Sequence, residues 1–127
     1  MKLFLVVLAA ARPKFLMLSV AMVCLAAATA FYQGYPVSVS LLWLTLLAAI
    51  GAHAAVNWLN EYEDLRSGLD TLTIKTPFSG GSGALPKAPY AAQAVLRSFQ
   101  VTVALLVGLG VAITFWVGWQ ILPIGLL

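Results

Sequence analysis

Residues 15–32 read FLMLSVAMVCLAAATAFY, an apolar stretch without a charged side chain. A helix of about 20 consecutive apolar residues crosses the hydrocarbon core of a bilayer, so this stretch predicts a membrane span. The rest of the chain has a similar character, because 62% of its 127 residues are hydrophobic and only 9% are charged. Soluble domains carry about 25% charged residues, and the composition therefore excludes an ordinary soluble domain.

Two further apolar intervals extend this prediction. No Asp, Glu, Lys or Arg occurs between Lys14 and Glu61, or from Ser98 to the end of the chain. The first interval is long enough for two crossings, and the QGYP sequence at 33–36 in its middle is typical of a turn. We therefore predict an all-α transmembrane helical bundle. Its three spans cover about residues 15–32, 37–59 and 98–122.

The basic residues predict the orientation. All seven lie before the first span or between the second and third: Lys2, Arg12, Lys14, Arg66, Lys75, Lys87 and Arg97. The positive-inside rule then places the N-terminus and the loop 60–97 in the cytoplasm of an integral, multi-pass protein of the cell inner membrane. Nucleic acid is not needed to explain the net charge of +3. We expect residues 1–11 to form an interfacial helix, with a secretory signal as the less favoured alternative.

Four acidic residues are grouped at the end of the second span: Glu61, Glu63, Asp64 and Asp70. If the helix continues past residue 59, then His53, Asn57, Asn60, Glu61 and Asp64 share one face, and Gly68 ends the helix. Such a face suits Mg²⁺, which binds through one or two carboxylates and substrate phosphates. It also suits proton or ion translocation. A solvated helix end that marks the membrane boundary is the plainer alternative, and His53 is equally consistent with packing.

The loop after this cluster is rich in glycine and serine. It reads TPFSGGSG at 76–83, and its backbone N–H groups and hydroxyls are able to face an anion. Arg66 and Lys75 bring positive charge nearby. A flexible linker between helices explains the glycines about as well.

Three segments together resemble one family. The run NWLNEYEDLRSGLDT at 57–71 resembles the first Asn/Asp-rich motif of the UbiA superfamily of membrane prenyltransferases, and is closest to the 1,4-dihydroxy-2-naphthoate polyprenyltransferase branch. The loop 76–83 and the sequence ARPK at 11–14 are similar to the same branch. Glu61 stands where that branch usually has Asp. Gly68 stands where other branches place the last Asp of the motif, a role that Asp70 would take.

The resemblance implies magnesium-dependent transfer of a prenyl group from a polyprenyl diphosphate to an aromatic acceptor such as 1,4-dihydroxy-2-naphthoate, in menaquinone biosynthesis. Asp64 and Asn60 would be central to catalysis. The implied metal ligands are Asn57, Asn60, Glu61, Asp64 and Asp70. The implied partners of the diphosphate are Arg12, Arg66 and Lys75.

Length is the main departure from the family. UbiA-type enzymes form a bundle of about nine transmembrane helices with a second acidic motif, and the resemblance covers only the N-terminal third of that bundle. We therefore expect an incomplete chain that is inactive alone. Its expected partners are the lipid bilayer and either the remaining helices of the bundle or further copies of itself. The alternative is a small noncatalytic membrane protein or subunit that uses its acidic face structurally or for ion handling.

Overall fold

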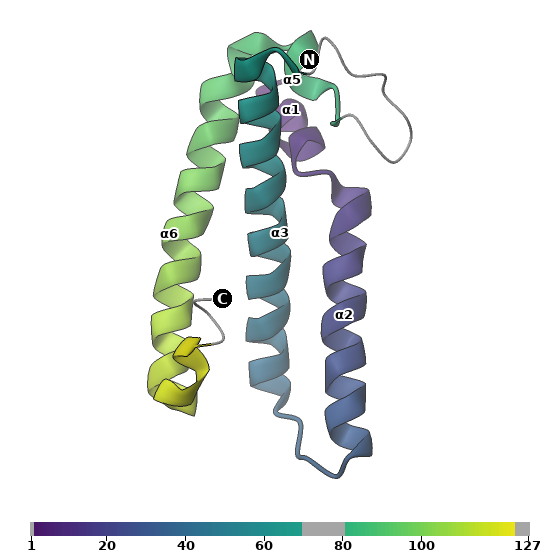
Figure 1. Cartoon of the computed structure of the whole chain (residues 1–127), viewed down its shortest axis with the longest axis vertical. Coiled ribbons are helices and arrows are strands. Elements are labelled where there is room, and N and C mark those ends of the chain that lie inside the picture. The colour runs from purple at the N-terminus through teal and green to yellow at the C-terminus, as the bar shows by residue number, and fades with distance from the viewer. Residues whose placement is uncertain (1, 70–80, 124–127) are drawn as a thin grey trace.

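The computed structural model describes residues 2–69 and 81–123 (Figure 1). All regular structure within these ranges is helical, which confirms the all-α prediction there. The elements are α1 (Leu3–Ala10), α2 (Pro13–Tyr32), α3 (Val39–Ser67), α5 (Ala84–Lys87), the 3₁₀ turn η1 (Pro89–Ala91), α6 (Ala92–Val117) and the 3₁₀ turn η2 (Trp119–Ile121).

Three of the helices are long and apolar enough to cross a membrane: α2, α3 and α6. Figure 1 shows α3 between the other two, with the turn from α2 to α3 at the lower end. α3 has 29 residues, and at about 1.5 Å per residue it is about 44 Å long. This length exceeds the roughly 30 Å of a hydrocarbon core, so the last turns of α3 project beyond the apolar zone with their acidic residues.

The helix ends follow local signals. α2 starts with Pro13, whose missing N–H costs nothing in a first turn. α3 runs through the acidic cluster and ends at Gly68, which has a φ of 75° and confirms the predicted stop. α6 begins at Ala92, earlier than the predicted 98, because residues 92–97 contain good helix formers and no breaker. It also ends earlier than predicted, before Gly118.

The interval 60–97, which we expected to be a loop, is therefore largely helical where the structure describes it. The end of α3, α5, η1 and the first turns of α6 all fall within it. These elements meet α1 at the upper end of the bundle in Figure 1. The buried apolar residues gather there in a group that we call the cap core: Val6, Ala10, Ala84, Leu85, Ala88, Ala91 and Val95.

The long helices bury little between themselves. In the apolar windows of α2 and α6 no residue is buried, and in that of α3 only 11% are. Exposed apolar side chains on such helices can contact lipid tails, which are as apolar as leucine. α3 and α6 approach closely at Gly51, where a Cβ would lie 3.3 Å from Cδ2 of Leu106 on α6.

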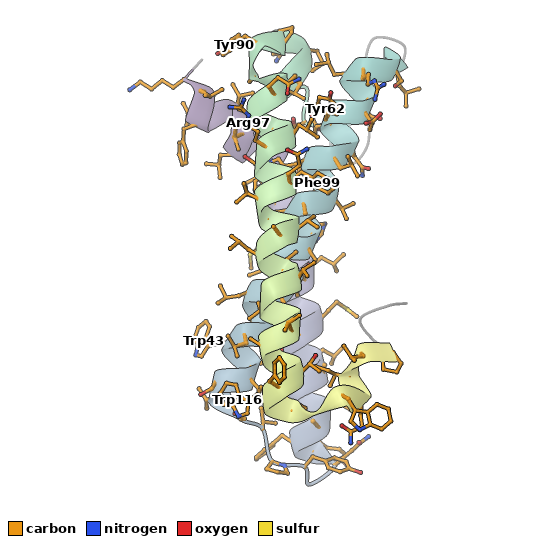
Figure 2. The ribbon with its side chains drawn as sticks, turned by 90° about the vertical axis from the view of Figure 1, so that its left-hand side faces the viewer. Trp43, Tyr62, Tyr90, Arg97, Phe99 and Trp116 are labelled. Atoms are coloured by element: carbon orange, nitrogen blue, oxygen red, sulfur yellow. The ribbon has the colours of Figure 1, made fainter. Side chains whose placement is uncertain are left out.

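The described charged residues lie toward one end of the bundle. Figure 2 shows Tyr62, Tyr90 and Arg97 at one end and Trp43 and Trp116 toward the other. The Lys, Arg, Asp and Glu residues that the structure describes lie just before α1, at the corner after it, in the first turn of α2, in the last turns of α3, in α5 and in the first turns of α6. This separation fits a membrane protein whose tryptophans lie near an interface. Which end faces the cytoplasm stays a prediction.

The opening segment is helical, as expected. On α1, Val6 and Ala10 are fully buried in the cap core, whereas Phe4 and Leu8 are exposed. α1 is therefore anchored on one side and presents an apolar surface on the other. A position within the membrane interface stays a prediction.

Candidate functional site

Polar side chains from α3 hold the corner between α1 and α2. The indole Nε1 of Trp58 donates a hydrogen bond to the carbonyl oxygen of Val7 at 2.8 Å. The amide Nδ2 of Asn57, which is buried, donates to the carbonyl oxygen of Ala11, also at 2.8 Å. Ala11 lies just beyond the last residue of α1, where carbonyl groups lack intrahelical partners. These two side chains therefore dock α1 onto α3.

Arg12 forms the corner itself. It has a φ of 53° and is the sole non-glycine residue with positive φ in the part of the chain that the structure describes. Side chains other than glycine enter this left-handed region at a cost of about 1 kcal/mol. The turn separates α1 from α2 and directs the guanidinium toward α3, where Nε and Nη2 both donate to Oε1 of Glu61, at 3.0 and 2.8 Å.

Glu61 is fully buried on α3 and receives four hydrogen bonds. Besides the two from Arg12, the hydroxyl of Ser82 donates to Oε2 at 2.8 Å, and the backbone N–H of Ser82 donates to Oε1. A buried carboxylate is tolerated when it is paired and its oxygens are hydrogen-bonded. Both conditions are met here.

The three partners come from separate parts of the sequence. Arg12 belongs to the ARPK segment, Glu61 to the run 57–71, and Ser82 to the loop 76–83. We call Arg12, Glu61 and Ser82 the carboxylate cluster. The sequence suggested that the glycine-rich loop faces an anion, and at Ser82 that anion is the carboxylate of Glu61. Ser82 was not among the predicted site residues, although its position in the glycine-rich loop 76–83 could have indicated it.

The other predicted residues have different surroundings. Asn60 is exposed on α3, and Asp64, one turn further along, is partly exposed. Arg66 is 72% exposed and lies 3.8 Å from Glu63 in a surface pair of little energetic weight. The structure thus brings Asn57, Asn60, Glu61 and Asp64 onto the end of one helix. Asp70 and Lys75 lie outside the described residues.

His53 makes a contact between helices. Its Nδ1 lies 2.8 Å from the hydroxyl oxygen of Ser19 on α2. Polar side chains often hydrogen-bond across helices within a membrane. His53 therefore has a packing partner two turns of α3 away from Glu61, which favours the packing interpretation of this residue.

The donor set suits a metal site that a substrate completes. Over residues 2–69 and 81–123, no group of three or more His, Cys, Asp or Glu side chains is placed to hold a metal ion. Asn60 and Asp64 nevertheless offer amide and carboxylate oxygens one helical turn apart. Mg²⁺ commonly binds through one or two carboxylates together with phosphate oxygens and water, and these two residues fit that pattern.

Comparisons with protein-family models, curated proteins and solved structures find no match.

Proposed function

We propose that this chain is part of a UbiA-type membrane prenyltransferase. The reaction is the Mg²⁺-dependent transfer of a prenyl group from a polyprenyl diphosphate to an aromatic acceptor such as 1,4-dihydroxy-2-naphthoate, a reaction of quinone biosynthesis. The convergence of the three motif segments on the carboxylate of Glu61 supports the proposal, because segments with a common task are expected to meet. A chance resemblance of three unrelated stretches gives no reason for them to meet.

Asn60 and Asp64 are the described residues that would hold Mg²⁺, with Asp70 as a further candidate. When bound, Mg²⁺ would neutralise the diphosphate as it leaves. Arg12, whose side chain is 21% exposed, and Arg66 lie on the same end of the bundle and supply positive charge for the diphosphate oxygens. The bond between the prenyl carbon and oxygen breaks with its electron pair going to the diphosphate, the acceptor ring attacks the allylic carbon, and the ring then loses a proton.

An apolar groove between α3 and α6 suits the isoprenoid tail. Its volume is about 540 Å³, and its lining includes Ala48, Ala52, Leu106 and Gly110. Ala52 precedes Glu61 by nine residues on α3, a separation of about 13 Å along the axis. Asp64 lies twelve residues beyond Ala52, about 18 Å along the axis, so the groove would hold the part of the tail beyond the first isoprene units.

The decisive experiment replaces Asp64. In Asp64→Ala, expressed from the native locus so that the protein has its natural length, we expect prenyl transfer at saturating Mg²⁺ to fall by on the order of a hundredfold or more. The assay follows labelled polyprenyl diphosphate and 1,4-dihydroxy-2-naphthoate in isolated membranes. Glu63→Ala is the matched control, because Glu63 is exposed on the same helix and should leave the rate nearly unchanged. An Asp64→Ala rate close to wild type would remove Asp64 from the site.

The noncatalytic alternative has one observation in its favour. Glu61 joins Arg12 and Ser82, which lie far apart in the sequence, and such a connection would also serve a purely structural acidic face. The same assay separates the two functions. Membranes that contain the wild-type chain and yield no prenylated product with any aromatic acceptor would favour a structural subunit.

A further inference from the structure

We propose that Glu61 is a positioning residue: its buried carboxylate locks Arg12 and Ser82 together and so presents the guanidinium of Arg12 to the phosphate groups of a substrate. We call the pairing of Glu61 with Arg12 and Ser82 the lock, and it follows from the contacts alone. The presentation to phosphate rests on the proposed function. The two parts are tested by different measurements.

The hydrogen-bond inventory argues against Glu61 as a metal ligand. Of the four hydrogen bonds that Glu61 accepts, three go to Oε1, which has about two lone-pair sites, and one goes to Oε2. Its side chain has no exposed surface. A cation at Oε1 would have to displace a donor, and a cation at Oε2, which accepts one bond, would still lie close to the positive charge of Arg12. Asn60 and Asp64, in contrast, are accessible on the same helix end.

The same contacts explain how Arg12 is left available. The guanidinium donates from Nε and Nη2 to the same oxygen of Glu61. A guanidinium carries five N–H donors, so three remain without a described partner, and the side chain keeps 21% of its surface exposed. Arginine recognises phosphate with a planar fork of donors, and a fork that is already oriented loses less entropy on binding. Glu61 supplies that orientation.

Ser82 extends the lock to the cap core. Its hydroxyl oxygen accepts a hydrogen bond from the backbone N–H of Ala84 at 3.1 Å while its hydroxyl donates to Glu61. Ala84 is the first residue of α5 and is buried in the cap core. The carboxylate therefore connects the corner before α2, the end of α3 and the start of α5. Loss of its charge should loosen all three.

A double-mutant cycle tests the lock without any ligand. Thermal unfolding of the purified protein in lipid nanodiscs is compared for Arg12→Gln, Glu61→Gln and the double variant. Each single change should lower the melting temperature, and the double variant should unfold close to the worse single one, because each single change leaves a buried or half-buried partner unsatisfied. The exposed pair Glu63 and Arg66, changed in the same way, should show no coupling. Additive losses at Arg12 and Glu61 would overturn the lock.

Binding of inorganic pyrophosphate tests the presentation. In Glu61→Gln we expect the affinity for pyrophosphate at saturating Mg²⁺ to fall by about tenfold, as for loss of an oriented charged hydrogen bond. The Mg²⁺ concentration for half-maximal binding should stay unchanged. A raised Mg²⁺ requirement with unchanged affinity at saturation would show instead that Glu61 is a metal ligand and would overturn the proposal.

Two further variants test whether Glu61 acts by orienting Arg12. Glu61→Asp keeps the charge but shortens its reach, and should give an intermediate loss of pyrophosphate affinity if Glu61→Gln does not fold. Arg12→Lys keeps the charge but lacks the planar fork of donors, and it should bind pyrophosphate more weakly than the wild type. Wild-type protein that fails to bind pyrophosphate would refute the proposed function and the presentation together, whereas the unfolding cycle would still decide the lock.

Discussion

Asn57 on α3 was predicted as a metal ligand, and a structural role for it can be tested directly. Its amide is buried and donates to the carbonyl oxygen of Ala11, which is itself buried. In Asn57→Ala the carbonyl loses its partner and gains no route to water. Leaving a buried acceptor unsatisfied costs about 1–3 kcal/mol, and we expect the free energy of unfolding to fall by that amount.

The assay is reversible unfolding in mixed micelles of rising SDS fraction, without Mg²⁺ and with tryptophan fluorescence as the signal, since Trp58 lies at the same junction. The matched control is Asn60→Ala, one turn away and exposed. Exposed substitutions without special contacts usually change stability by within about 0.5 kcal/mol. Equal losses for the two variants would refute the reasoning. So would an unchanged stability of Asn57→Ala without metal, because Asn57 would then act through a ligand.

Three further predictions test the fold. Trp58→Phe should lower the free energy of unfolding by about 1 kcal/mol through loss of its hydrogen bond to α1, and an unchanged value would contradict the docking of α1. Gly51→Leu should cost about 1–3 kcal/mol, since a Cβ there already lies 3.3 Å from Leu106, whereas Gly51→Ala should cost much less; equal costs would argue against close packing of α3 and α6. In a background without the native cysteine, Ser67→Cys should react with a membrane-impermeant thiol reagent from the cytoplasmic side and Tyr35→Cys from the opposite side, and the reverse pattern would invert the predicted topology.

Local features of the sequence determined much of the fold. The uncharged stretches predicted three apolar helices because a span needs only length and hydrophobicity within one segment. Gly68 marked the end of α3 because its left-handed conformation is a property of one residue. The start of α6 was placed six residues late because the prediction followed the absence of charge, whereas helix propensity carries α6 back through Arg97 to Ala92.

The composition of the candidate site was predicted in part. The helical period placed Asn57, Asn60, Glu61 and Asp64 together because neighbours at three and four positions share a face. It did not distinguish their surroundings. Asn57 and Glu61 are buried by α1, Arg12 and the loop at Ser82, while Asn60 remains exposed, and such differences depend on what packs against the helix.

The pairing of Arg12 with Glu61 was decided by the tertiary structure. The two residues are 49 positions apart, and the sequence shows several cations and carboxylates that could have paired in other ways. Three conditions select this pair: the left-handed turn at Arg12, the docking of α1 by Asn57 and Trp58, and the return of the chain at Ser82. The last two conditions are contacts between segments that are distant in the sequence. The charges of Arg12 and Glu61 pair only when the fold brings these segments together and excludes water from between them.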